Sequence, residues 1–584
     1  MTLFDFAAGD DIGVVFSVDT GTVTVCVTDE QKLRTLQVNQ LVAIRSSKAG
    51  QHLVGTISKI TRKAAIPQTD QEDEHDAPAP LVENWMRVLL VGTHLDAEGT
   101  RRNAFRRSME TVPEIDAEVF VLAGDRLTNF MRALSHASES SKHALQIGAY
   151  AIDEAAEAFL DGDKLFQRHA AIVGSTGSGK SCTVATIVEQ AAKLPNVSAL
   201  LFDLHGEYEP LVGPGVSRLK IAGPGDLEGG KGLSAGVLHL PYWLLTYEEM
   251  LSMMLDRSDQ NAPNQAMVLK REILDAKARQ LAAEDDKDLE ACFTIDSPVP
   301  YSLKAVRDRL EELDQEQVEG ARKGTTKAGP FNGKLTRFVQ RLDSRRTDRR
   351  LGFLFEPPEH TEAMDWLDKA AEALLGGTKL RSDGGVKIVD FSEVPSDILP
   401  LVAGLVARVV FSVQQWISKE ERHPVALLCD EAHLYIPDSI EAGPAREGLQ
   451  AFERVAKEGR KYGVALVVIS QRPSEVNRTV LSQCGNFVAM RLTNAEDQSV
   501  VRRLLPDTLG GFADLLPILD VGEAVVVGDA ALLPCRVRVR RPSREPASTS
   551  VPIWSRWGET TKQGGIAKGV RALRMQQSEA PPIT

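Results

Sequence analysis

The stretch Gly174-Ser175-Thr176-Gly177-Ser178-Gly179-Lys180-Ser181 decides the fold of this chain. It fits the phosphate-binding loop pattern G-x-x-x-x-G-K-[ST] at every position. The apolar run 170–173 before it is typical of a buried strand, and residues 182–194 after it are typical of a helix. Glycines let backbone N–H groups surround a phosphate while the helix N-terminus faces the anion. The stretch therefore predicts a nucleoside triphosphate site, and a chance Gly/Ser turn is the weaker alternative.

Within this loop we expect Lys180 to reach the β- and γ-phosphates and the Ser181 hydroxyl to bind Mg²⁺. The next buried strand, 200–203, ends in Asp203 at the edge of the sheet where ligands bind, with His205 and Glu207 just beyond. A metal at His205 is a weak alternative, because only one histidine is present there. The expected nucleotide-contacting residues are Gly174, Ser175, Thr176, Gly177, Ser178, Gly179, Lys180, Ser181, Cys182 and Asp203.

Hydrolysis needs an activated water, and a second apolar run supplies the acids for it. Residues 425–429 read as a buried strand that ends in Asp430 and Glu431. We expect Asp430 to hold Mg²⁺ and Glu431 to act as general base on the attacking water. The alternative is a solvated acidic turn.

A third strand, 464–470, ends in Gln471, which we expect to sense the γ-phosphate and the water. A polar strand end without a catalytic role is the alternative. Just before this strand, Arg460 could project into the nucleotide of a neighbouring subunit and stabilise the transition state. An ordinary solvated charge is an equally good interpretation of Arg460 from spacing alone.

Composition narrows the class of protein. The chain has 584 residues, 43% of them hydrophobic and 26% charged, with a formal net charge of −13. The length predicts about two to four domains, and the acidic balance leaves room for a local basic channel. Six scattered cysteines without C-x-x-C fit a reducing cytoplasm. No secretion signal and no apolar run of about 20 residues are present, so we expect a soluble cytoplasmic protein with no membrane contact.

Hydrophobic patterning predicts an α/β fold with a RecA-like P-loop ATPase core, an N-terminal β-barrel and a helical insertion. Residues 12–66 alternate as short strands, and the segment 70–80 is acidic and Pro-rich, as in a mobile loop. The predicted parts are the barrel, 1–140; the first part of the core, 141–245; the helical insertion, 246–380; the second part of the core, 381–534; and a C-terminal brace or tail, 535–584.

Several of these motifs together resemble HerA, a hexameric DNA-translocating ATPase or helicase of the FtsK–HerA branch of P-loop proteins. The resemblance rests on the run from Arg168 through the loop, the strand end 203–208, the tetrad Asp430-Glu431-Ala432-His433, and the stretches 459–462 and 470–473. It covers roughly residues 8–540, and the order of the parts matches too.

The resemblance implies a homo-hexamer with ATP and Mg²⁺ at its interfaces and DNA through its centre. It places Lys180 and Ser181 on phosphate and Mg²⁺, Asp430 on Mg²⁺, Glu431 as base and Gln471 as sensor. Arg460 is the favoured arginine finger, and Arg168 is a second candidate on the phosphate side. It also implies a second protein on the barrel: a nuclease, or a sirtuin-like NAD-consuming effector in a bacterial antiphage system, which we favour. A NurA-type nuclease in DNA-end resection is the alternative.

Other readings stay open. The chain could be an ATP-binding scaffold that assembles and activates an effector enzyme, or, less well supported, a membrane-docked conjugation ATPase. The densest basic stretch, 335–350, could line a DNA channel or form a solvated helix face. In the tail, Trp554 and Trp557 favour a brace that buries both rings on a neighbouring subunit over a DNA contact.

Overall fold

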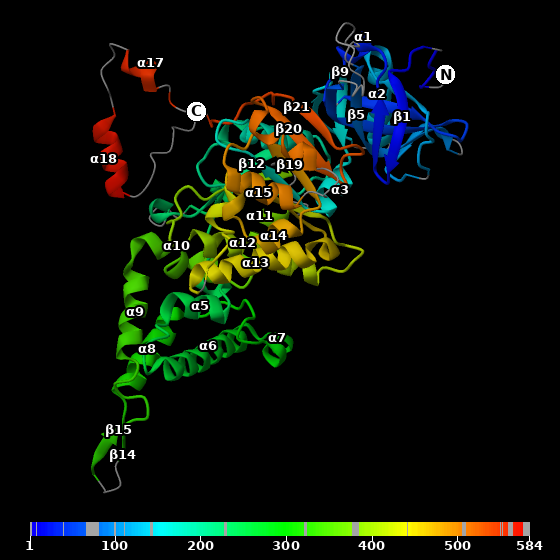
Figure 1. Ribbon diagram of the computed structural model, residues 1–584. Coiled ribbons are helices and arrows are strands. Elements are labelled where there is room, and N and C mark those ends of the chain that lie inside the picture. The colour runs from blue at the N-terminus through cyan, green and yellow to red at the C-terminus, as the bar shows by residue number, and fades with distance from the viewer. Residues whose placement is uncertain are drawn as a thin grey trace, which may run out of the picture. The chain divides into compact units, whose positions relative to one another are not determined.

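The computed structural model describes residues 3–7, 9–38, 40–65, 81–98, 101–109, 111–139, 144–226, 231–319, 324–376, 385–440, 442–504, 510–548, 551, 553–558 and 565–575. The chain divides into two compact units. The first unit consists of residues 1–190 and 485–542, and the second of residues 191–484 and 543–584 (Figure 1). The acidic segment 70–80 lies outside the described residues.

The N-terminal part of the first unit is a closed β-barrel, drawn in blue in Figure 1. Six strands run in the order β2-β1-β7-β3-β4-β5, and β2 pairs with β5 to close the ring, while β6 extends β5 outside it. Alternating side chains such as Val23 and Val25 point into an apolar core. The strands and helices are β1 (Gly13–Asp19), β2 (Thr22–Cys26), α1 (Glu30–Leu33), β3 (Leu41–Arg45), β4 (Gln51–Ala65), β5 (Leu81–Glu98), β6 (Arg101–Arg106), β7 (Glu118–Val121) and α2 (Gly124–Glu139). The predicted barrel is confirmed.

The rest of the first unit is a sheet with the strand order β10-β19-β20-β21-β8-β9. Only β10 and β19 run parallel; the other neighbours are antiparallel. Its elements are β8 (Leu145–Tyr150), β9 (Asp153–Leu160), α3 (Gly162–Gln167), β10 (Ala170–Val173), α4 (Lys180–Ala191), β19 (Asn486–Met490), α15 (Ala495–Leu504), α16 (Gly510–Ala513), β20 (Glu523–Gly528) and β21 (Cys535–Val539). The phosphate-binding stretch joins β10 to α4, as the sequence predicts.

The second unit is built on six parallel strands in the order β13-β12-β16-β11-β17-β18. These strands are β11 (Ala199–Asp203), β12 (Val216–Ile221), β13 (Val237–Leu238), β16 (Val386–Asp390), β17 (Val425–Cys429) and β18 (Val464–Ser470). β11, β16, β17 and β18 are buried along their whole length, which explains their almost uninterrupted apolar sequence. Because all six strands are parallel, their carboxyl ends lie along one edge of the sheet. The predicted α/β class is confirmed.

Helices α12 (Leu399–Trp416) and α13 (Pro444–Glu458) approach each other very closely in this unit. A Cβ on Gly404 would lie 2.4 Å from the Cα of Gly448, so both crossing positions need glycine. Helix α12 is long and apolar enough to cross a membrane, but 72% of it is buried inside the protein. Helices buried in the core of a protein can have the same length and hydropathy as a membrane-spanning helix.

Between β13 and β16 the chain forms the helical segment that Figure 1 draws in green. Helix α8 packs against both α6 and α9. Inside this segment the Lys277 ammonium is buried and donates to the carbonyls of Ile295 and Ser297. The segment consists of α5 (Tyr247–Met254), α6 (Ala262–Glu284), α7 (Lys287–Cys292), α8 (Leu303–Gln315), β14 (Gln317–Glu319), β15 (Thr326–Ala328), α9 (Thr336–Thr347), α10 (Gly352–Phe355) and α11 (Trp366–Leu375); later in the chain come α14 (Arg478–Ser482), α17 (Ile553–Trp557) and α18 (Ile566–Met575).

Candidate nucleotide site

The phosphate-binding loop (P-loop) of the first unit is held in place by its own backbone. The Ser175 amide donates to the Arg491 carbonyl over 2.8 Å, and the Gly522 amide donates to the Ser178 carbonyl over 2.9 Å. A third bond, from the Ser178 amide to the Ser175 carbonyl, closes the turn at 3.1 Å. The loop is therefore fixed by main-chain groups on both sides, and the Ser175 hydroxyl adds a contact by accepting from the Thr493 amide over 3.2 Å.

Glycine is required at two positions of this loop. Gly179 has φ +102°, and a Cβ there would lie 3.2 Å from the backbone of Gly522. At Gly174 a Cβ would lie 2.5 Å from Ser178 Oγ. Gly177 also has a positive φ, +74°, but its Cβ would meet no atom within 4 Å. At Gly174 and Gly179 the neighbouring atoms therefore leave too little room for a side chain. At Gly177 only the backbone conformation disfavours one.

The residues after the loop fit an anion. Lys180 begins α4 and is only 7% exposed, and Ser181 and Cys182 follow it as half-buried residues. The first turn of α4 contains no acidic residue that would repel a phosphate. The N-terminus of this 12-residue helix thus combines its partial positive charge with a lysine and a glycine-rich backbone. This donor set suits the phosphates of a nucleotide.

The second unit holds the predicted acids at the end of β17. Asp430 is 6% exposed and is fixed on both sides. The Tyr208 hydroxyl donates to Asp430 Oδ2 over 2.7 Å, and the Glu431 amide donates to Oδ1 over 2.9 Å. The Tyr435 hydroxyl donates to the Asp430 carbonyl over 2.8 Å. Burial raises the pKa of both tyrosines well above the ordinary value, so their hydroxyls stay protonated and remain donors.

Glu431 adopts a backbone conformation that is unusual for a residue with a side chain. Its φ is +46° and its ψ +42°, in the left-handed region. Such strain persists only where the surroundings enforce it, and it is common at functional sites. The side chain is 14% exposed, and its Oε2 lies 3.4 Å from His433 Nδ1.

His433 also connects the turn after β17 to the end of β18. Its Nδ1 lies 3.3 Å from the Ser470 hydroxyl, which accepts a 3.0 Å bond from the Arg472 amide. Gln471 stands between these two residues and is half-buried. Glu431 and Gln471, predicted as base and sensor, are thus brought to adjacent strand ends.

Asp203, at the end of β11, shapes the loop that follows it. Its carboxylate accepts bonds from the amides of His205, Glu207 and Tyr208 at 3.3, 3.1 and 3.0 Å. The residue is 2% exposed, and burial is the main cause that raises its pKa to about 6. By ordering this loop, Asp203 positions the hydroxyl of Tyr208 against Asp430. His205 is exposed and belongs to no cluster of metal-binding side chains in the described part of the chain.

The two candidate arginines differ in their surroundings. Arg460 lies in the turn Gly459–Tyr462, is exposed, and forms no ion pair with any residue that the structure describes. Arg168 follows α3, and its Nε lies 3.6 Å from Asp529 Oδ2. Of the two, Arg460 is therefore the one whose charge has no ion-pair partner among the described residues.

In the basic stretch 335–350, three of the six arginines are seen in ion pairs with carboxylates of the same chain. Arg341 pairs with Asp256 at 3.1 Å, Arg346 with Glu356 at 3.3 Å, and Arg350 with Asp348 at 2.7 Å. These pairs favour the solvated helix face over a DNA channel for this stretch.

The C-terminal segment begins on the loop after β11. The Ala547 amide donates to the Glu207 carbonyl at 2.7 Å, and Arg544 Nη1 donates to the Val212 carbonyl at 2.6 Å. Further on, Trp554 and Trp557 are 85% and 73% exposed, with ring centroids 6.4 Å apart. A brace on a neighbouring subunit stays a prediction, and within this chain the two rings are not buried.

Sequence reasoning placed the acids correctly at strand ends but assigned no role to Tyr208, Tyr435 or His433. Their importance comes from hydroxyl and imidazole contacts with Asp430, Glu431 and Ser470. A tyrosine five residues after a strand-end aspartate looks like any core aromatic in one sequence, so no signal distinguished it.

Comparison with known proteins identifies the central region. Residues 145–410 match the family model "Helicase HerA, central domain". The DNA double-strand break repair helicase HerA of Pyrococcus furiosus is 24% identical over 433 residues, covering 68% of this chain and 69% of the relative. The same-named protein of Saccharolobus solfataricus is 23% identical over 410 residues, covering 69% and 70%.

Among solved structures, the bacterial conjugative coupling protein TrwB is 14% identical with a TM-score of 0.43, covering 72% of this chain and 93% of that one. VirB4 of Thermoanaerobacter pseudethanolicus is 15% identical with a TM-score of 0.44, covering 70% and 97%. These two likenesses are too distant to add to the assignment. The assignment rests on the P-loop between β10 and α4, the match over 145–410 and the curated relatives. By these features, the chain is a P-loop ATPase that is similar to the HerA helicases.

Proposed function

We propose that this chain is the motor subunit of a hexameric ring that hydrolyses ATP to move DNA. The observation that carries the proposal is the complete P-loop, with its required glycines and Lys180, inside the region that matches the HerA central domain. The relatives' names, DNA double-strand break repair helicases, support DNA as the polymer that is moved. We place its work on DNA in the cytoplasm.

The proposed roles follow from the chemistry of each group. Bound MgATP supplies the phosphoanhydride bond whose hydrolysis releases the energy for movement. The P-loop amides and Lys180 bind its phosphates, and Ser181 and Asp430 supply oxygens for Mg²⁺. Glu431 accepts the proton of the attacking water, and Gln471 orients that water. Cys182 and Asp203 remain proposed nucleotide neighbours, Asp203 acting through the loop that it orders.

Arg460 is proposed as the arginine finger that acts on the nucleotide of the next subunit. Its exposure and its lack of an ion pair within the described residues support this role. Such a finger contributes about 10³–10⁵-fold to turnover in related chemistry. Arg168, which already faces Asp529, is the second candidate.

A mixing experiment separates a finger that acts in trans from one that acts in cis. Lys180→Ala subunits keep Arg460, and Arg460→Ala subunits keep an intact P-loop. If Arg460 acts in trans, mixed rings contain some complete interfaces and recover part of the ATPase activity that each variant lacks alone. Mixed rings as inactive as the two parents would assign Arg460 to its own subunit, and the same mixture with Arg168→Ala tests the second candidate.

We further propose that the barrel docks a second protein, and that this protein is a nuclease or a sirtuin-like NAD-consuming effector of an antiphage system. Apolar side chains exposed on the barrel unit support a docking surface: Phe16 is 59% exposed, Val38 51%, Val112 59% and Ile115 58%. A NurA-type nuclease is the alternative partner. Co-purification with the products of the neighbouring genes tests both, with Phe16→Ser expected to weaken capture. Ile518→Ser, at an apolar residue outside the barrel that is 68% exposed, is the matched control.

Steady-state ATPase activity, measured with and without linear duplex DNA beside mass photometry, tests the motor. Stimulation of a six-subunit species by DNA is the expected result. If DNA leaves the ATPase activity of the ring unchanged but a co-purified partner alters it, the ATP-binding scaffold becomes the better hypothesis than the DNA motor.

A further inference from the structure

One cluster of metal-binding side chains lies in the barrel, outside the nucleotide-binding machinery. His52 on β4 and His94 on β5 are direct partners across the antiparallel pair. Asp96 lies two residues after His94, so both side chains project from the same face of β5. Just before β4, the Gly50 carbonyl accepts a hydrogen bond from the Asp96 amide. Gly50 has no side chain that would fill the space beside Asp96. Strand register alone brings the three residues together.

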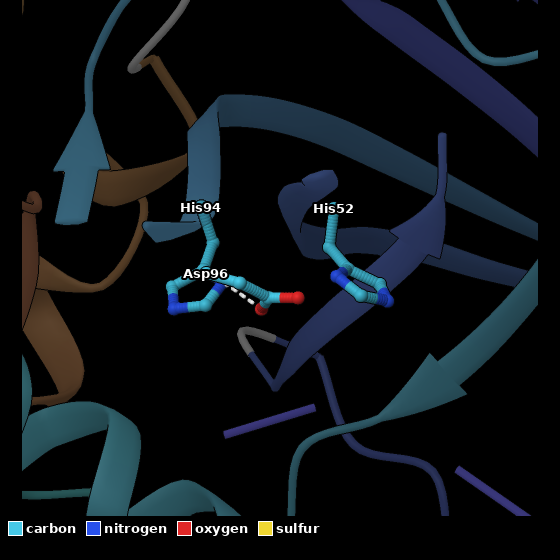
Figure 2. A group of neighbouring side chains, drawn as sticks. All are labelled: His52, His94 and Asp96. Atoms are coloured by element: carbon cyan, nitrogen blue, oxygen red, sulfur yellow. Dashed lines mark ion pairs between the residues drawn. The ribbon is translucent and has the colours of Figure 1, made fainter. Parts of the chain in front are cut away.

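The donor atoms of these three residues converge. One ligand atom from each lies within 4.8 Å of the other two, and His94 Nδ1 is 3.8 Å from Asp96 Oδ1. Figure 2 shows the Asp96 carboxylate between the two imidazole rings in this view. Ligand atoms on one tetrahedral zinc lie about 3.3 Å apart, because each is about 2.0–2.1 Å from the ion. Small side-chain rotations therefore close the cluster around a single ion.

Four polar atoms of these side chains have no hydrogen-bond partner in the part of the chain that the structure describes. His94 is fully buried, and neither of its ring nitrogens has a hydrogen-bond partner among the described residues. The same holds for His52 Nδ1 and Asp96 Oδ1, which are also shielded from solvent. Polar atoms buried without partners destabilise a fold, so four of them in one corner indicate that a ligand is missing.

The surroundings favour the form of histidine that binds metals. The Phe4 ring lies 4.4 Å from the His94 ring and 5.2 Å from the His52 ring, and Phe130 lies 6.1 Å from His94. Burial among these rings lowers the pKa of His94 to about 4 and also lowers that of His52. Neutral imidazoles are the ligands that transition metals require.

We propose that His52, His94 and Asp96 bind one Zn²⁺ ion, with water completing its coordination. Two imidazole nitrogens and one carboxylate suit zinc, whereas Ca²⁺ and Mg²⁺ favour oxygen ligands throughout. The ion joins β4 to β5 beneath Phe4, so it stabilises the barrel and stands apart from ATP hydrolysis. We expect moderate affinity, because no described residue hydrogen-bonds His94 to orient its ring. Such partners typically contribute about 10–100-fold to metal affinity.

The test uses the full-length protein, stripped with a chelator, reloaded with Zn²⁺ and dialysed before elemental analysis. We expect about one zinc per chain, and stripped protein titrated with Co²⁺ should show the visible absorption of a low-coordinate site with nitrogen ligands. His52→Gln and Asp96→Asn should each lower Zn²⁺ affinity at least tenfold. His205→Gln, an exposed histidine outside the cluster, is the control and should bind like the native chain.

Two readouts keep folding separate from binding. Zinc should raise the melting temperature of the native chain and of His205→Gln, but not that of Asp96→Asn, whose side chain has almost the same shape. Near-ultraviolet circular dichroism and retained ATPase activity check that the variants are folded. Native protein that takes up neither Zn²⁺ nor Co²⁺ at about 100 µM would overturn the proposal. Uptake that survives unchanged in folded His52→Gln and Asp96→Asn would overturn it as well.

Discussion

The P-loop after β10 and the acidic turn after β17 both follow a buried strand, yet they hold their polar groups differently. The P-loop presents backbone amides, and its form depends on glycines that lie at positive φ or in crowded positions. The acidic turn presents carboxylates, and its form depends on hydroxyl donors from Tyr208 and Tyr435. The first arrangement suits tight binding of an anion. The second keeps charged side chains ready for chemistry, so binding and hydrolysis should respond to different substitutions.

The largest expected effect comes from a substitution in the acidic turn that should stop hydrolysis without disturbing the P-loop. Glu431→Gln removes the proposed base but keeps the shape of the turn, so kcat for ATP hydrolysis should fall about 10²–10⁴-fold. Binding of ATP, measured by fluorescence titration of a labelled nucleotide, should remain. Glu420→Gln, at an exposed position of the same unit, is the matched control. A variant with normal turnover would remove Glu431 from the mechanism.

Lys180→Ala acts on the P-loop side. It removes a charge-assisted contact to phosphate worth about 1.5–3 kcal/mol, so nucleotide affinity should weaken about 10–100-fold. Turnover should be lost with it at ordinary ATP concentrations. The exposed Lys419→Ala should bind like the native protein. Hydrolysis at the normal rate in Lys180→Ala would contradict the assignment of the site.

The two left-handed glycines of the P-loop form a matched pair. Alanine at either position costs about 1–2 kcal/mol for the left-handed backbone. Only Gly179→Ala also presses a Cβ onto the Gly522 backbone, so it should weaken ATP binding clearly more than Gly177→Ala. Equal affinities for the two variants, measured in the same titration, would show that crowding does not control the loop.

Tyr208→Phe tests the acidic turn. It leaves Asp430 Oδ2 without the Tyr208 donor and costs about 1 kcal/mol, so the Mg²⁺ concentration for half-maximal activity should rise about 5-fold. ATP binding without Mg²⁺ should not change. Tyr247→Phe removes a similar 2.7 Å bond, to the Ala266 carbonyl in the helical segment, and should leave the Mg²⁺ requirement unchanged.

The last prediction concerns the pH dependence of stability and leaves ATP binding and turnover aside. Burial raises the pKa of Asp203 to about 6 from its ordinary 3.8, so the native state holds this proton more tightly than the unfolded chain does. Its contribution to stability is therefore fully present below about pH 4 and is lost as the pH rises through 6, by at most about 3 kcal/mol. Urea unfolding of Asp203→Asn should lack this part of the pH dependence. Identical profiles for the variant and the native chain would refute the raised pKa.

Much of the fold and part of the site could be predicted from the sequence. The P-loop is a local pattern, and the strand that ends in Asp430 and Glu431 shows itself through a continuous apolar run. The barrel strands were visible as alternation between apolar and polar residues. These signals lie within a few consecutive residues, where period and glycine content have direct physical meaning.

Contacts between distant residues could not be predicted in the same way. The bond from Tyr208 to Asp430 joins two strands, and the pair His52–His94 depends on the register of β4 against β5. A shift of one residue in that register would place His52 on the other face of the sheet. In the sequence, the arginines of 335–350 form one basic stretch. In the structure, Arg341 and Arg346 pair with Asp256 and Glu356, which lie outside that stretch.

The first unit has a consequence for synthesis on the ribosome. β10 ends at Val173, but the strand that pairs with it, β19, begins only at Asn486. During translation the entire middle of the chain must therefore emerge before the P-loop strand finds its parallel neighbour. Pairings over so long a separation form slowly, and the exposed apolar edge of a waiting strand invites aggregation. Nascent chains that stop before β19 should therefore be ready clients of chaperones.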